Sequence, residues 1–91
     1  KLSPENETLK YYYALSIMET GQVETTLKIL EEAYNINPYN MNVIFALVTI
    51  NRDQNHLEDA LKYAKILYEL APHSQSTQQL LNQIQSMINS Q

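Results

Sequence analysis

The side chains that could perform acid–base chemistry gather at one point of the chain. Three carboxylates, those of Asp53, Glu58 and Asp59, lie close to His56 in the sequence. A catalytic pair needs two titratable groups that converge on the same reacting bond. Carboxylates near the start of an expected helix more commonly face solvent and the positive end of that helix. We therefore expect a solvated surface here rather than an acid–base pair.

Metal and nucleophile chemistry is no better supported. His56 and His73 are 17 positions apart, and no third ligand is spaced to join them. Ser16 has no evident His–Asp partner. The chain contains no cysteine, which excludes thiolate metal sites, a cysteine nucleophile and haem attachment through cysteine within it. We expect no catalytic residue, no metal and no cofactor, and hence a protein that is not an enzyme.

Composition limits the classes of partner. With 44% hydrophobic and 18% charged residues, the 91-residue chain has the composition of one small globular domain. Ten acidic and six basic residues give a net charge of −4, so a nucleic-acid partner is not expected. The longest apolar run, residues 43–48, is far shorter than the ~18 residues of a membrane span. We expect a soluble protein without membrane insertion, and the lack of cysteine suits the cytoplasm and the periplasm equally.

The elements that position these side chains repeat along the chain. Pro4, Pro38 and Pro72 are evenly spaced, and the 34-residue period that they define is typical of stacked repeats. Gly21 and Asn55 are separated by the same period, and these residue types enter the left-handed backbone conformation at the lowest cost. The pairing predicts a turn with positive φ at the same place in two units.

Apolar residues at three- and four-residue spacing predict helices within each unit. The expected helices cover about 5–20, 23–36, 39–53, 56–70 and 74–89, with Ser3 capping the first. Residues 43–50 are rich in β-branched types and would also suit a buried strand, but the 34-residue register favours a helix. The uncharged stretch from Leu70 to Gln91 is either a polar tail or a docked helix, and the apolar stripe from Leu80 to Ile88 favours the helix.

Paired helices, a tight turn and a 34-residue period ending in proline resemble the tetratricopeptide repeat (TPR) family. Ala14, Gly21, Ala33 and Ala60 match the family's small residues, whereas its tryptophan is absent. The resemblance implies an all-α, right-handed superhelical solenoid of antiparallel helix pairs. Residues 7–40 and 41–74 would form two repeats, 1–6 the tail of a preceding repeat, and 75–91 a capping helix. It further implies a piece of a larger bacterial protein.

The same resemblance indicates where a partner would bind. In TPR proteins the first helix of each pair lines the concave face. The resemblance therefore implies a non-catalytic scaffold that binds a partner on this face. Helical geometry selects the residues of these helices that point away from the second helix. The predicted binding residues for a peptide or partner helix are Tyr11, Tyr12, Leu15, Phe45, Thr49 and Arg52. The cationic clamp that TPR co-chaperones use for a carboxylate is missing, because Tyr11, Leu15 and Ala46 occupy its positions.

Two alternatives remain open. The first is a homo-oligomer, such as a homodimer, that forms through an open face at the start of the chain, comprising Leu9, Tyr13 and Ile17. Tyr13 is at the same time expected to lie on the core side of its helix. The second is a TPR region attached to a larger protein, since residues 45–72 are similar to segments found beside bacterial multihaem cytochrome domains. Any haem would then lie outside this chain.

Overall fold

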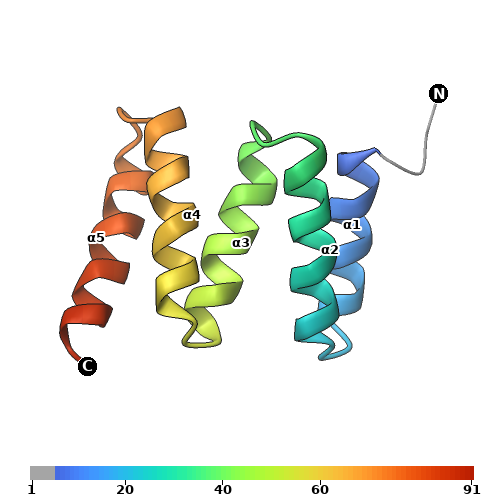
Figure 1. Ribbon diagram of the computed structural model, residues 1–91, viewed down its shortest axis with the longest axis horizontal. Coiled ribbons are helices and arrows are strands. Elements are labelled where there is room, and N and C mark those ends of the chain that lie inside the picture. Colours follow the sequence, from blue (N-terminus) through green and yellow to red (C-terminus); the bar gives the residue numbers. More distant parts are fainter. Residues whose placement is uncertain (1–5) are drawn as a thin grey trace.

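Five α-helices make up most of residues 6–91, the part of the chain that the computed structural model describes. Consecutive helices run in opposite directions and are joined by short turns (Figure 1). The helices are α1 (Glu7–Met18), α2 (Val23–Ile36), α3 (Met41–Asp53), α4 (Leu57–Leu70) and α5 (Gln75–Asn89). No strand occurs within the described residues, so the all-α prediction is confirmed. Residues 43–50 belong to α3, and the alternative of a buried strand there is wrong.

The helix starts follow the period of the sequence because equivalent side chains cap them. α1, α3 and α5 begin at residues 7, 41 and 75, directly after Asn6, Asn40 and Ser74. Each of these three residues accepts hydrogen bonds from backbone N–H groups of the first helical turn. The predicted starts at residues 5, 39 and 74 are therefore slightly early. The proposed cap Ser3 lies outside the described residues, and Asn6 caps α1.

The turns within the two helix pairs have the predicted left-handed residue. Gly21 has φ of 85° and Asn55 has φ of 64°. Glycine adopts this conformation without steric cost, and asparagine is among the few other residues that tolerate it. α2 and α4 end shortly before Pro38 and Pro72, as expected for residues that precede proline.

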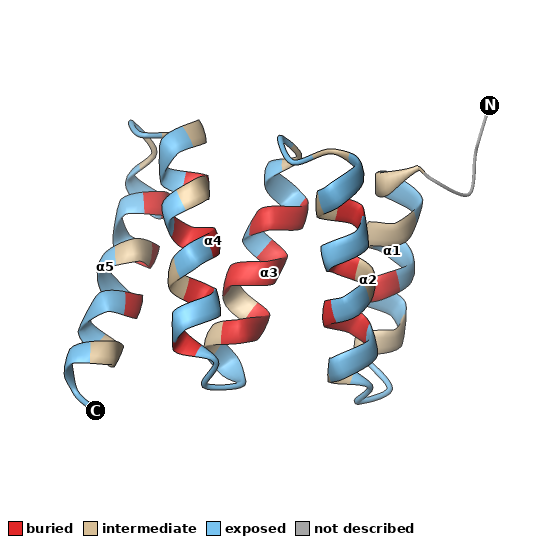
Figure 2. Cartoon of the chain, in the orientation of Figure 1, coloured by how far each residue is buried: buried red, intermediate tan, exposed pale blue. Residues whose placement is uncertain are grey.

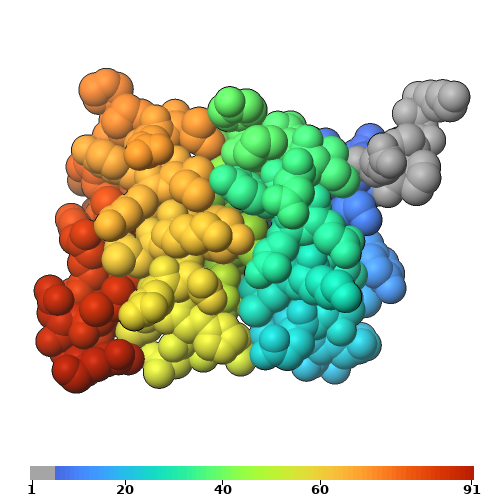
Figure 3. All heavy atoms as spheres, in the orientation of Figure 1, coloured from blue at the N-terminus to red at the C-terminus, as the bar shows by residue number. Residues whose placement is uncertain are grey.

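The core is centred on α3. Each helix packs mainly against its neighbours in sequence, so α3 lies between α2 and α4. Figure 3 shows α2 and α4 on the face turned to the viewer, with α3 largely covered behind them. In Figure 2 buried positions dominate α3. Its fully buried side chains are Val43, Ile44, Leu47 and Val48.

The C-terminal segment is a docked amphipathic helix. Leu80 and Ile84 are buried against the rest of the protein, and α5 packs on α4. The opposite side of α5 is exposed and carries mainly glutamine, asparagine and serine side chains. The prediction of a docked helix is confirmed, and the polar tail is wrong.

None of the helices within residues 6–91 is both long enough and apolar enough to cross a membrane.

A carboxylate anchors the start of α1 to the loop between α2 and α3. Asn37 and Asn40 each donate a side-chain hydrogen bond of 3.1 Å to Oε2 of Glu7. These two bonds lower the pKa of Glu7 below its ordinary value of 4.5. A lowered pKa in the folded state means that ionised Glu7 stabilises the fold above that ordinary value. This contribution is lost as the pH falls through the lower pKa of the folded state.

We therefore expect the melting temperature to fall on acidification, partly through Glu7. Glu7→Gln should show a smaller decrease than the wild type between about pH 5 and about pH 2, because its side chain does not titrate there. Thermal unfolding followed by circular dichroism at several pH values measures both profiles. Identical pH profiles for the two proteins would contradict a role for Glu7.

Candidate partner-binding face

The three candidates on α1 differ in exposure. Tyr11 is half-buried and packs against the hydrophobic core. Its ring meets that of Tyr12 edge-to-face, with 5.4 Å between the ring centroids. Tyr12 is 63% exposed, and Leu15 is also exposed. Tyr11 thus supports Tyr12 from the core side, while Tyr12 and Leu15 offer apolar surface to solvent.

On α3, the exposed candidate is Phe45. Most of the middle of the helix is buried, yet the Phe45 side chain is 50% exposed. Thr49, one turn further along, is half-buried, and its hydroxyl donates to the carbonyl oxygen of Ala46 at 3.3 Å. That contact satisfies the hydroxyl within its own helix. Of these two candidates, Phe45 is therefore the one that offers a free side chain to a partner.

Arg52 already has two polar partners. Its Nε donates to Oδ1 of Asp53 at 3.1 Å, and its Nη1 donates to Oε1 of Gln83 at 3.1 Å. The second contact joins α3 to α5, so this part of the surface extends onto α5. Because the carboxylate of Asp53 offsets the positive charge of Arg52, Arg52 is not an unpaired cation that would bind a carboxylate ligand.

Gln83 is absent from the predicted site residues, although the sequence contains the signal for it. Gln83 follows Thr49 by one 34-residue period, and Thr49 follows Leu15 by another. The same register relates Tyr11, Phe45 and Gln79. The face that includes the predicted binding residues therefore has an equivalent on each of α1, α3 and α5, and it becomes more polar towards α5. We call this surface the odd-helix face; it comprises the six predicted binding residues and two glutamines of α5, namely Tyr11, Tyr12, Leu15, Phe45, Thr49, Arg52, Gln79 and Gln83.

The three residues of the expected oligomer face lie together on another side of α1. Tyr13 is 58% exposed, Leu9 is exposed, and Ile17 is half-buried. The expectation that Tyr13 lies on the core side is wrong: Ala14 is the fully buried residue of α1, and Tyr11 packs on the core instead. The physical reason is that no described helix covers the side of α1 that carries Tyr13.

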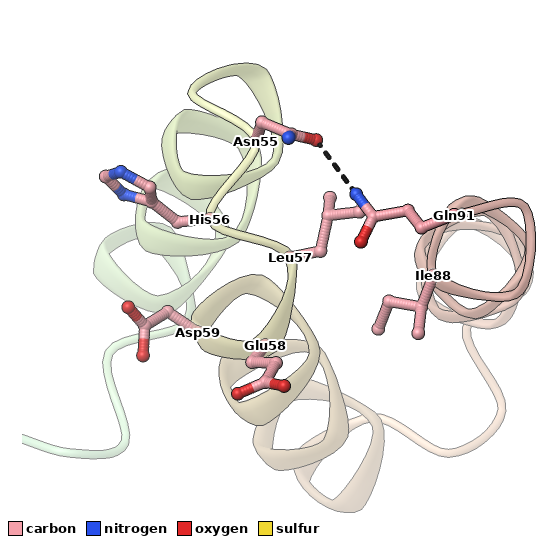
Figure 4. Close-up of a pocket in the computed structure, with 7 residues that line it drawn as sticks. All are labelled: Asn55, His56, Leu57, Glu58, Asp59, Ile88 and Gln91. Carbon is pink, nitrogen blue, oxygen red and sulfur yellow. Dashed lines mark hydrogen bonds between the residues drawn. The ribbon is translucent and has the colours of Figure 1, made fainter.

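Among the described residues, no hydrogen bond or ion pair joins His56 to Asp53, Glu58 or Asp59; His56 lies 3.4 Å from Oδ1 of Asn51 instead. A hollow in the surface lies where the turn between α3 and α4 meets the end of α5. In Figure 4, His56 and Asp59 point to the opposite side of this turn from Ile88 and Gln91. The one hydrogen bond across the hollow is long, 3.5 Å from Nε2 of Gln91 to Oδ1 of Asn55. Within the described part of the chain, no three His, Cys, Asp or Glu side chains group in a way that could hold a metal ion.

Comparison with known proteins does not indicate a role for this face. No model of a known protein family matches the sequence, and no curated protein matches it. The role of the odd-helix face thus rests on the chain's own residues.

Proposed function

We propose that this protein is a non-catalytic interaction scaffold of the TPR type. Residues 7–40 and 41–74 form its two repeats, and residues 75–91 cap the array as part of a right-handed solenoid. A peptide or a partner helix binds across the odd-helix face. The 34-residue spacing of helix starts, caps and left-handed turn residues supports this assignment.

The exposure of Phe45 is the observation that carries the proposal. Six of the 13 residues of α3 are buried apolar side chains, and Phe45 lies among them with half its surface in water. Exposed aromatic side chains of this kind commonly serve as anchors at protein–protein interfaces. Tyr12 and Leu15 occupy the corresponding face of α1 and are exposed as well.

The charges near this face indicate the chemistry of the ligand. Tyr12, Leu15, Phe45 and Thr49 are uncharged, and Arg52 is paired with Asp53. A ligand gains most here by burying apolar side chains, with hydrogen bonds to Gln83 at the edge. We expect an extended segment or an amphipathic helix with aromatic or aliphatic anchors, rather than an acidic tail.

Peptide selection tests the proposal. Peptides selected from a random displayed library on the wild-type protein should carry apolar anchors. Phe45→Glu should weaken their binding by at least about 30-fold, equivalent to about 2 kcal/mol, because it places a charge where an anchor is buried. Fluorescence anisotropy with labelled peptides measures the affinities.

The matched control is Tyr39→Glu, which introduces the same charge at a 74% exposed aromatic residue in the loop between α2 and α3. Binding to this variant should equal that of the wild type. Equal affinities for the Phe45→Glu and Tyr39→Glu variants would show that the peptides bind elsewhere.

A further inference from the structure

The outer face of α1 is exposed although the chain buries the equivalent face of α3. Leu9, Tyr13 and Ile17 lie at successive turns along α1. Their equivalents in the next repeat are Val43, Leu47 and Asn51, which are 0%, 0% and 3% exposed. In α3 this face is covered because α2 and α4 pack around it. In α1 the same face meets water, and apolar side chains occupy all sides of the helix, which is typical of a helix with further partners.

The electrostatics of this face suit contact with an identical face. Lys10 pairs with Glu32 on α2, with 3.3 Å between Nζ and Oε1. Glu7 accepts hydrogen bonds from the loop between α2 and α3. Both charged side chains within α1 are thus engaged by neighbouring elements, and the stripe of Leu9, Tyr13 and Ile17 is neutral. Two such stripes meet without opposing like charges.

The order of the residues also fits a two-fold axis. A bulky aliphatic residue precedes Tyr13 by four positions, and another follows it by four. When two copies of α1 pack antiparallel, Tyr13 meets Tyr13 of the second copy, and Leu9 meets Ile17. An isologous contact requires this kind of self-complementarity.

The other end of the protein does not offer a complementary surface. The exposed side of α5 consists mainly of amide and hydroxyl side chains. Covering these groups with the apolar face of α1 would bury polar atoms without hydrogen-bond partners. Head-to-tail stacking is therefore disfavoured relative to a closed head-to-head pair.

We propose that Leu9, Tyr13 and Ile17 form a homodimer contact, in which α1 packs antiparallel against α1 of a second copy about a two-fold axis at Tyr13. The contact is small, because a 12-residue helix is only about 18 Å long. A single helix pair buries less than the ~1,200 Å² of a stable interface. The dimer is accordingly weak, with a dissociation constant between about 10 µM and about 1 mM.

Sedimentation equilibrium over a wide range of concentration tests the contact. The average mass of the wild type should rise from one chain towards two between about 1 µM and about 1 mM. Tyr13→Glu places two carboxylates at the axis and should weaken association at least about tenfold. Tyr39→Glu, with the same charge on the loop, should leave association unchanged. Circular dichroism should show that both variants keep the helicity of the wild type.

The absence of cysteine allows a direct test of the geometry. Tyr13→Cys should form a disulfide-linked dimer on mild oxidation, because facing helices bring residues at the axis within disulfide distance. Leu9→Cys and Ile17→Cys should cross-link poorly alone but readily when mixed. Tyr39→Cys serves as the control and should not cross-link.

A chain that stays monomeric at all concentrations would overturn the proposal and indicate a different occupant, such as a helix with the apolar pattern of α2. A dimer that survives Tyr13→Glu but dissociates in Phe45→Glu would equally overturn it and place the contact on the odd-helix face.

Discussion

Leu47→Ala is expected to lower the free energy of unfolding by about 3–4 kcal/mol, the largest loss we predict for a single truncated side chain. Leu47 is 0% exposed and lies in α3, which packs against both α2 and α4. Alanine leaves a cavity that the closely packed helices fill only in part. The total stability of a domain of this size is about 5–13 kcal/mol, so the variant keeps only about 1–10 kcal/mol and should unfold at a clearly lower urea concentration than the wild type. Urea denaturation followed by circular dichroism measures the loss.

The matched control is Tyr13→Ala, which truncates the equivalent residue of the preceding repeat. Tyr13 is 58% exposed and contributes little to the core of one chain. Its loss should cost less than about 1 kcal/mol at protein concentrations low enough to keep the chain monomeric. Similar losses for the two variants would mean that α1 and α3 are equally buried, which contradicts the central place of α3.

Removal of α5 is expected to have the second large effect. A chain that ends at Pro72 loses Leu80 and Ile84, both buried, and uncovers the side of α4 on which they pack. Each buried aliphatic side chain contributes about 1.5–3 kcal/mol, so two of them account for about 3–6 kcal/mol. The shortened chain should melt at a much lower temperature, or show no cooperative transition at all.

Point variants test the same helix while the chain keeps its length. Ile84→Asp buries a charge at a position with 0% exposure and should destabilise the fold strongly. Gln85→Asp places the same charge on the adjacent, exposed residue and should change the melting temperature little. The cap role of α5 would be refuted by a truncated chain that melts like the wild type, or by equal effects of the two substitutions.

Most of the helix boundaries could be predicted because local signals repeat. Proline at 38 and 72 marks the helix ends, and the Gly21–Asn55 pair marks the turns. The predicted starts of α1, α3 and α5 lie one or two residues before the true ones. Asn6 and Asn40 mark the true starts, since their side chains accept the first N–H groups of α1 and α3.

The exposure of individual side chains was harder to predict. Helical period separates Tyr11, Tyr12 and Tyr13 by about 100° each but does not say which of the three sides has a neighbour. Tyr13 has the position of the buried Leu47 and is nevertheless exposed, because α1 lacks the second neighbouring helix that α3 has. The contact of Arg52 with Gln83 depends on how α5 docks, which periodicity alone does not define.

The most direct test of the proposed scaffold function is to map a bound peptide by NMR. A peptide selected on the wild-type protein is titrated into the isotope-labelled chain, and the shifts of backbone amides and aromatic side chains are followed. The proposal predicts that the largest shifts fall on the odd-helix face, around Tyr12, Leu15 and Phe45, with smaller ones near Gln83. Shifts concentrated on α2 and α4, with Phe45 unaffected, would contradict it.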